Sequence, residues 1–260
     1  MTRHGLLLLL LATVLSAGPR LAAAASDNAS PTAVAAPLAL DAVIDNLVRR
    51  NEERARALQS AQAIRIYHLA YRGFPGDREA EMTVHACYTS PSSKSFEVIS
   101  QKGSKIILDR VFKKLLESEK EAAAPEVRDR TLLNRANYEF ALEGYEPSDQ
   151  GGQYVLKVTP KSKSKFLYQG KVWVDGTDFA VTQIEGEPAQ NPSFWTKKSE
   201  IHHQYTRVQG FWLPVRNQSV SYIRLGGRAT LTIEYKDYHV TDGRQVGADV
   251  SARPTGKSSQ

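Results

Sequence analysis

The sequence predicts a mainly antiparallel β protein with helices, in which helical segments cover a large and strongly curved sheet. From residue 138 onward, apolar strand segments alternate with turns that carry glycine, such as Asp175-Gly176 and Gly226-Gly227. No crossover helix separates these strands, although parallel pairing would require one. A sheet of about ten strands is near the limit at which it stays open, so it should curl and form a concave face.

The N-terminal residues, 1–25, have the pattern of a secretory signal peptide. Arg3 and His4 precede an apolar run that starts at Leu6, and small residues around Ala25 suit cleavage. The run is far shorter than the roughly 20 residues that a membrane-spanning helix needs. We therefore expect an exported, periplasmic protein that is cleaved near Ala25.

An amphipathic helix is predicted over 39–58, because apolar residues recur there at spacings of three and four. Its apolar side carries Val43, Ile44, Leu47 and Val48, whereas most of its charged residues take the other side. Such a helix needs an apolar surface to cover, and the concave face of the sheet offers one. It is either a lid that opens or a fixed part of the core.

Three strands and a helical insertion are predicted to follow this helix. The strands cover 61–72, 79–89 and 94–101. Turn sequences such as FPGD separate them. The insertion covers 105–135, where Ile107, Val111 and Leu115 form one apolar row.

The predicted organisation is a single domain over 39–244 that acts as a monomer. A flexible leader over 26–38 precedes it, because this segment is small, polar and bounded by proline. The segment 245–260 has a similar composition and is expected to be a disordered tail.

Charge and cysteine content restrict the function further. Lys and Arg exceed Asp and Glu by 34 to 28, but no face is visibly loaded with basic residues, so nucleic acid is not an expected partner. The basic segment 160–165 is interpreted as a solvated loop, with a weak contact to anionic headgroups as the alternative. Cys87 is the only cysteine, so the fold has no internal disulfide.

Catalytic and metal-binding patterns are not found in the sequence. It contains no G-x-S-x-G, H-E-x-x-H or P-loop motif. His202 and His203 are adjacent in a predicted strand, so their side chains point to opposite faces and do not share a metal. His85 and Cys87 share a face, but no third group orients them, and Cys87 is interpreted first as a small buried hydrophobe.

The DGTD sequence at 175–178 is similarly interpreted as a turn, because the downstream acid of a calcium loop is missing. We therefore expect no enzyme activity, catalytic residue, metal or cofactor.

A hairpin is predicted over 170–188, and both of its faces carry apolar residues. Trp173 points away from the valines on either side of it, and Phe179 and Val181 share a face that is opposite to that of Ile184. The pattern is explained if one side packs against protein and the other lines a cavity, since aromatic residues gather in this half of the chain. The residues expected to line the cavity are Val43, Ile44, Leu47, Val48, Trp173, Phe179, Trp212 and Tyr222.

The order of elements resembles the superfamily of periplasmic lipoprotein carriers and sensors that includes LolA, LolB and the sigma-factor regulator RseB. The resemblance rests on the signal peptide, the helix at 39–58, the strands over 61–101, and the stretch from GQYVLKVTPK through GKVWVDGTDFAVTQIEGEP to FWLPVRNQSVSY. It implies an unclosed half-barrel of about ten to eleven strands, plugged by helices, with an apolar cavity for acyl chains.

The sequence departs from this superfamily at two places. The insertion at 105–135 is longer and more helical than in a plain carrier, and the lid-locking arginine of the family aligns with no single residue. The resemblance implies a carrier of lipoprotein acyl chains or another apolar ligand, with transient contact to the membrane or an envelope protein. The alternative is a regulatory or scaffold protein that binds a protein partner through an edge strand or the insertion.

Overall fold

The computed structural model of this chain describes residues 37–147, 152–191, 193–224 and 226–243. The predicted signal peptide, most of the predicted leader and the predicted tail lie outside the described residues.

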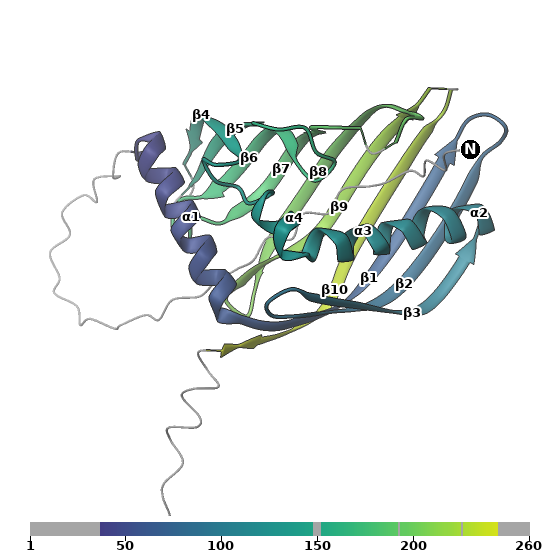
Figure 1. Ribbon diagram of the computed structural model, residues 1–260, viewed down its shortest axis with the longest axis horizontal. Coiled ribbons are helices and arrows are strands. Elements are labelled where there is room, and N and C mark those ends of the chain that lie inside the picture. The colour runs from purple at the N-terminus through teal and green to yellow at the C-terminus, as the bar shows by residue number, and fades with distance from the viewer. Residues whose placement is uncertain (1–36, 148–151, 192, 225, 244–260) are drawn as a thin grey trace, which may run out of the picture.

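The described residues form one antiparallel sheet of ten strands, in the order β3-β2-β1-β10-β9-β8-β7-β6-β5-β4 (Figure 1). The strands are β1 (Leu58–Arg72), β2 (Arg78–Thr89), β3 (Ser93–Gly103), β4 (Tyr138–Glu146), β5 (Gln153–Pro160), β6 (Tyr168–Asp175), β7 (Val181–Pro188), β8 (Thr196–Val208), β9 (Phe211–Ile223) and β10 (Arg228–Asp242). The sheet is unclosed, because β3 and β4 are its two edges and do not pair with each other. The predicted fold class is therefore confirmed.

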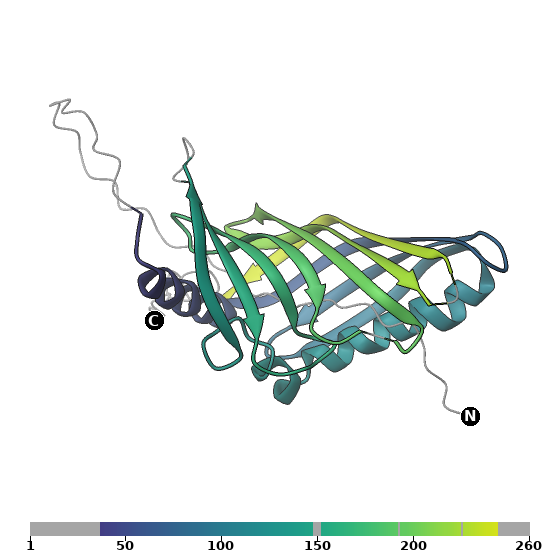
Figure 2. The same ribbon diagram turned by 90° about the horizontal axis from the view of Figure 1, so that it is seen from above.

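Helices lie along one side of this curved sheet, which we call the inner face (Figures 1 and 2). They are α1 (Leu40–Ala57), α2 (Lys105–Ile107), the π-helical turn η1 (Leu108–Phe112), α3 (Lys113–Ala123) and α4 (Pro125–Asp129). In Figure 1, α1 lies at the β4 end of the sheet, and the helices of the insertion cross in front of its other half. The predicted helix and helical insertion are thus both observed.

Two large apolar clusters lie on the inner face. The α1 cluster joins α1 to the strands β4 to β8 and includes Val43, Leu47, Leu156, Val172, Ile184 and Tyr205. The α3 cluster joins the insertion to β1, β2 and β10 and includes Tyr67, Met82, Phe112, Leu115, Leu231 and Ile233. Each helical cover therefore has its own half of the sheet.

The hairpin over 170–188 differs from the predicted alternation in one respect. Val174 pairs with Val181, whereas Trp173 pairs with Gln183, so Thr182 is an extra residue on β7. This β-bulge reverses the side-chain direction. Val181 and Ile184 consequently both join the α1 cluster, and the prediction that they face opposite sides is wrong.

The predicted environment of Cys87 is also corrected by the structure. Val84 and Ala86 of β2 are buried in the α3 cluster, and Cys87 lies on the other face together with His85. None of the helices in the described residues covers that outer face, and Cys87 is half-buried rather than buried. Its Sγ lies 3.9 Å from both ring nitrogens of His85.

The basic segment at 160–165 contacts the region of the insertion. Lys165 Nζ lies 2.7 Å from a carboxylate oxygen of Glu121 in α3. Lys161 Nζ donates to the backbone carbonyl of Arg135 over 2.7 Å. These two lysines tie the end of β5 and the loop after it to the segment that covers the sheet.

Candidate functional site

The candidate site is the contact between α1 and the inner face, because it joins most of the predicted ligand-binding residues. Val43 and Leu47 are fully buried in the α1 cluster, and Phe179 and Trp212 pack against that cluster. Ile44 is buried as well, and Val48 is half-buried. The helical spacing of these four α1 residues therefore identified the covered side of the helix correctly.

Trp173 and Tyr222 lie away from this contact. Trp173 is half-buried between Val172 and Val174, which point inward, so the indole lies on the outer face. Its Nε1 donates to Glu146 over 3.4 Å. Tyr222 is 37% exposed and follows the buried Ser221 in β9. Strand alternation thus places both aromatic residues on the opposite face from the cluster.

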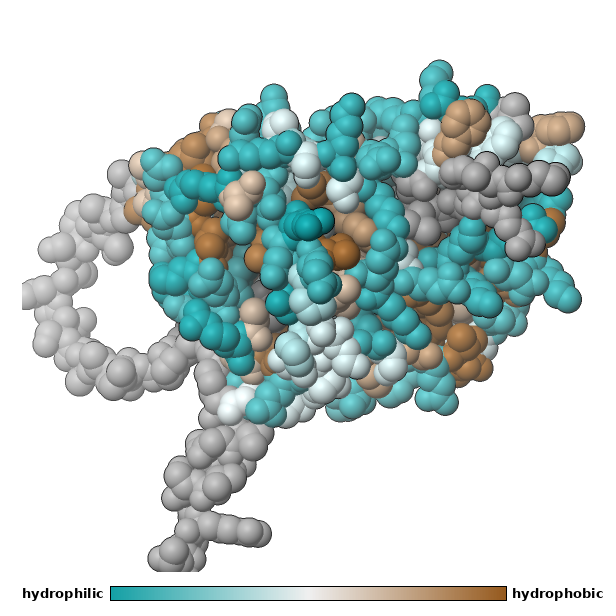
Figure 3. All heavy atoms as spheres, viewed as in Figure 1, coloured by the Kyte–Doolittle hydropathy of each residue, from teal (hydrophilic) through white to brown (hydrophobic). Residues whose placement is uncertain are grey.

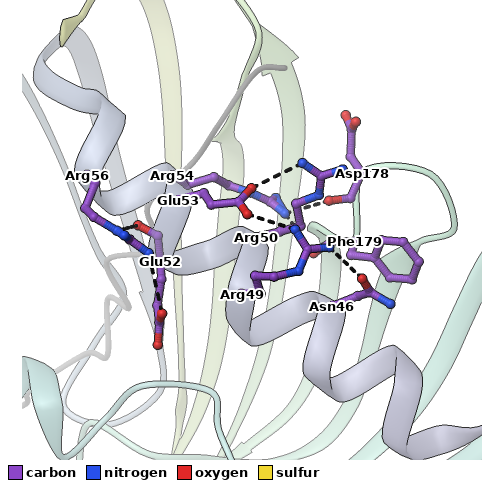
Figure 4. A network of polar contacts seen from close by, with 9 residues as sticks. All are labelled: Asn46, Arg49, Arg50, Glu52, Glu53, Arg54, Arg56, Asp178 and Phe179. Carbon is purple, nitrogen blue, oxygen red and sulfur yellow. Dashed lines mark hydrogen bonds and ion pairs between the residues drawn. The ribbon is translucent and has the colours of Figure 1, made fainter. Parts of the chain in front are cut away.

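Arg54 is the charged residue in the contact between α1 and the sheet, and it is only 1% exposed. Its Nη2 donates to the backbone carbonyls of Asp178 (2.8 Å) and Phe179 (2.7 Å), which lie between β6 and β7 (Figure 4). Burial lowers the pKa of Arg54 to about 10, which the nearby Asp178 carboxylate partly opposes. The guanidinium is therefore charged at neutral pH and attaches α1 to this loop.

The loop that accepts Arg54 is itself held in place by side chains. Asp175 Oδ1 accepts the backbone N–H groups of Thr177 (2.9 Å) and Asp178 (2.6 Å), which forms an Asx-type turn. Trp212 Nε1 of β9 donates to Asp178 Oδ2 over 2.9 Å. The two carbonyls are therefore held in position by residues outside α1.

The rest of α1 is attached more weakly. Near its start, Arg135 forms ion pairs with Asp41 and Asp45, and the backbone N–H of Leu38 donates to Tyr154 Oη over 3.0 Å. The ion pairs are solvent-exposed, and such pairs contribute about 0 to 1 kcal/mol each. Apolar burial and Arg54 therefore supply most of the attachment of α1.

Charged residues on the outward side of α1 pair mainly with one another, as Figure 4 shows. Arg49 and Arg50 both approach Glu53, and Arg56 approaches Glu52. These i,i+3 and i,i+4 pairs support the helix without attaching it to the sheet.

The sequence prediction did not include Arg54 among the functional residues. It lies two helical turns after Leu47, so it falls on the apolar side of α1, where a charged residue is unexpected. That position is the signal that could have identified it.

The remaining chemical candidates are separated in the structure. His203 is buried on the inner face, whereas His202 lies 3.2 Å from Glu185 on the other side of β8. Within the described ranges, no group of three or more His, Cys, Asp or Glu residues has a metal-binding arrangement. None of the helices in those ranges has both the length and the apolar composition of a membrane-spanning helix.

Comparison with known proteins gives similarity in structure alone. No protein-family model matches the chain, and no curated protein matches it. The chain is similar to a DUF1329 family protein from Desulfovibrio piger, with 11% identity, a TM-score of 0.38, and coverage of 77% of this chain and 92% of that one.

Two further solved structures are similar over most of the chain. A putative outer membrane lipoprotein-sorting protein domain from Vibrio parahaemolyticus has 12% identity and a TM-score of 0.38, with 81% of this chain and 98% of that one covered. A LolA superfamily protein from Nitrosomonas europaea has 14% identity and a TM-score of 0.33, with 79% and 94% covered. Similarity at this level assigns no ligand, partner or activity to the chain.

Proposed function

We propose that this protein is an exported, periplasmic binding or carrier protein for an acylated or otherwise apolar ligand, which it holds against the inner face under α1 without catalysis. The observation that supports this function best is the contact between α1 and the sheet. A broad apolar surface lies under one amphipathic helix, and that helix is attached to the loop between β6 and β7 by a single buried cation.

The energetics favour displacement of α1 by a ligand over spontaneous opening. Val43, Ile44 and Leu47 are buried, and three such side chains contribute roughly 5 to 9 kcal/mol. This is too much for a helix that opens freely in water. An acyl chain that replaced the same contacts would offset most of the loss, so opening and ligand binding would be coupled.

The polar attachment is suited to release. Arg54 is bound by carbonyl oxygens rather than by a carboxylate, and its buried Nε has no hydrogen-bond partner among the described residues. The desolvation penalty of this buried cation cancels part of the stabilisation that its hydrogen bonds supply. The attachment therefore fixes the position of α1 and adds only about 1 to 2 kcal/mol to the free energy of opening.

The test uses native mass spectrometry for co-purified lipid, together with binding of the uncharged apolar dye N-phenyl-1-naphthylamine. Leu47→Glu distinguishes a lid from a core helix: a lid variant should stay folded and lose dye affinity, whereas a core variant should unfold. Arg56→Glu is the matched control, since Arg56 lies on the exposed side of the same helix. If the wild-type protein binds neither lipid nor dye, the proposed function is wrong.

A second candidate function is recognition of a protein partner through the edge strand β3. Val98 is 46% exposed and Ile99 is 56% exposed on this edge, and Ile106 at the start of the insertion is 50% exposed. Figure 3 shows apolar side chains at the surface over this part of the molecule. An edge strand has unpaired backbone groups to which an extended segment of an envelope protein can add.

Affinity capture from periplasmic extract separates the two functions. A carrier should yield lipid or lipoprotein, whereas a sensor should yield one specific partner protein. Ile99→Lys should abolish capture of that partner and leave dye binding unchanged. If the Ile99→Lys variant captures the partner as well as the wild type does, recognition through β3 is ruled out.

A further inference from the structure

A polar strip crosses the inner face between the two apolar clusters. We call it the inner polar stripe, and it consists of Thr196, Ser199 and His203 of β8 and Asn217, Ser219 and Ser221 of β9. All six side chains are buried. The register pairs Ser199 with Ser221 and His203 with Asn217. It also pairs Ser219 with Ile201, which belongs to the α1 cluster, so the stripe residues share the inner side of the sheet.

Apolar residues flank the stripe on both sides. On β7, Ile184 of the α1 cluster pairs with His203. On β10, Leu231 and Ile233 of the α3 cluster pair with Ser219 and Asn217. A band of hydroxyl and amide groups thus separates two apolar surfaces on the same face.

Several polar atoms of this region have no partner within the described part of the chain. They are Oγ1 of Thr196, Oδ1 of Asn217, Oγ of Ser219 and the hydroxyl of Tyr168, all of them buried. Tyr168 belongs to the α1 cluster and extends the set to β6. Other polar atoms are satisfied: Ser199 and Ser221 share a hydrogen bond of 2.8 Å, and Asn217 Nδ2 donates to Tyr235 Oη over 2.8 Å.

The side chains around these atoms are uncharged at neutral pH. Burial, with a smaller effect from His202, lowers the pKa of His203 to about 4, so its imidazole is neutral. Burial raises the pKa of Tyr168 and of Tyr235 well above the usual range, so both phenols keep their protons. Elsewhere on the inner face, Arg65 is paired with Glu119, and Arg54 donates to the carbonyls of Asp178 and Phe179.

We propose that the inner polar stripe binds the uncharged head of an amphiphilic ligand, whose apolar chain lies on the flanking clusters. This inference rests on the proposed carrier function and specifies its ligand class. Hydroxyl groups of Thr196, Ser219 and Tyr168 can donate to ester carbonyls, and Asn217 Oδ1 can accept from a hydroxyl. A glyceride, with ester carbonyls and hydroxyls but no charge, has this combination.

The free-energy cost of burying polar and charged groups is the reason why an uncharged polar head fits this stripe. A buried polar group without a hydrogen bond destabilises the fold, so a purely apolar ligand would leave these four atoms unsatisfied. A carboxylate or phosphate head would have to be buried among the uncharged side chains of the stripe, which is more unfavourable still. An uncharged head with donors and acceptors avoids both penalties.

The test compares 1-monooleoylglycerol, oleate and N-phenyl-1-naphthylamine as ligands of the wild-type protein and of the double variant Thr196→Val, Ser219→Ala. Thr230→Val is the matched control, because Thr230 of β10 lies on the outer face beside the inward-pointing Leu231. The wild type should bind the glyceride more tightly than oleate. The double variant should bind the glyceride roughly tenfold less tightly, as expected for one to two lost hydrogen bonds, with dye affinity unchanged.

Thermal unfolding without ligand gives a second readout. Removing unsatisfied polar atoms should leave the melting temperature of the double variant equal to or above that of the wild type. If the double variant unfolds, Tyr168→Phe replaces it in the same comparison.

If the wild type binds the dye, the carrier function stands and three results would overturn the inference alone. The double variant could bind the glyceride as tightly as the wild type does. The wild type could bind oleate more tightly than the glyceride, or could fail to bind the glyceride at all. If the wild type binds neither the dye nor any of these lipids, the proposed function and the inference fail together.

Discussion

Arg65 of β1 and Glu119 of α3 form an ion pair with 2.5 Å between Nη1 and Oε2, at a position where Glu119 is only 2% exposed. Tyr67 donates to the other carboxylate oxygen over 2.8 Å. Burial lowers the pKa of Arg65, but the Glu119 charge together with the contacts to Tyr67 and Tyr235 outweighs this effect and raises the pKa well above the usual range. An arginine thus lies at each helical cover: Arg65, whose side chain is 16% exposed, is bound by a carboxylate under α3, and the buried Arg54 is bound by backbone carbonyls under α1.

The first prediction concerns this pair. Glu119→Gln leaves the Arg65 guanidinium buried without its counter-charge, and the free energy of unfolding should fall by about 3 to 5 kcal/mol. Glu121→Gln is the control, because Glu121 pairs with Lys165 at the surface and its loss should cost less than about 1 kcal/mol. Urea unfolding followed by fluorescence measures both. Equal losses in the two variants would contradict the assignment.

The second prediction concerns the attachment of α1. Arg54→Met removes the two hydrogen bonds to the carbonyls of residues 178 and 179 while keeping an apolar stem, so α1 should open more often. Its amide protons should exchange faster by roughly tenfold, as expected for the loss of about 1 to 2 kcal/mol. Ligand affinity should rise, because less free energy is needed to open the site. Hydrogen exchange read by mass spectrometry tests this.

The control for Arg54→Met is Arg49→Met, which removes an exposed ion pair with Glu53 on the same helix. Exchange in α1 should change little in this variant. Slower exchange or weaker ligand binding in Arg54→Met would show that Arg54 does not restrain opening.

The third prediction is a pH dependence of stability that arises from His203. Its pKa is about 4 in the folded protein and 6.5 as the ordinary value. The unfolded chain therefore binds a proton first as the pH falls, so stability is fully present above pH 6.5 and decreases towards pH 4. The loss should reach about 3 kcal/mol, and no further loss from this group should occur at lower pH.

His203→Gln should remove this pH-dependent loss, whereas His202→Gln should retain it because His202 is partly exposed beside Glu185. Chemical denaturation at several pH values between 4 and 7 provides the comparison. A wild-type slope that persists in His203→Gln would assign the dependence to other groups.

The fourth prediction concerns the close approach of β6 and β7. Gly170 and Gly186 face each other across the two strands, and a Cβ added at Gly186 would lie 2.0 Å from the backbone oxygen of Gln169. Gly186→Ala should therefore lower the free energy of unfolding by roughly 1 to 3 kcal/mol. Gly144→Ala, where a Cβ would meet no atom within 4 Å, should be neutral or slightly stabilising. Thermal unfolding of the two variants decides between these outcomes.

Much of the fold was predictable because each element has a simple periodicity. The helix predicted over 39–58 is observed as Leu40–Ala57, and the first three strands appear within a few residues of their predicted bounds. The order of strands was not predictable from these patterns, since periodicity carries no information about which strands pair. The face of Val181 was also missed, because strict alternation assumes that no bulge such as Thr182 interrupts the strand.

The residues of the candidate site that lie on α1 were predictable, whereas those that lie on the sheet were predicted less well. Val43 and Leu47 follow from the helical repeat, whereas Trp173 and Tyr222 were chosen for their aromatic character, which does not determine the face on which a side chain lies. The inner polar stripe was missed for a similar reason. Serines in a strand usually indicate its solvated side, and only the register shows that Ser219 lies next to Leu231 inside the molecule.

The pairing of β1 with β10, the third and fourth strands from the β3 edge of the sheet, has a consequence for how the chain folds. These strands lie almost at opposite ends of the described sequence, and their pairing extends from Leu58↔Asp242 to Arg72↔Arg228. Contacts between such distant segments form slowly, because a long loop must close first. The junction between β1 and β10 therefore cannot form until β10 has been synthesised, and the β1–β3 segment meanwhile lacks its neighbour. The two parts of the sheet on either side of this junction, β1 to β3 and β4 to β10, are thus joined only by the last strand of the chain to be made.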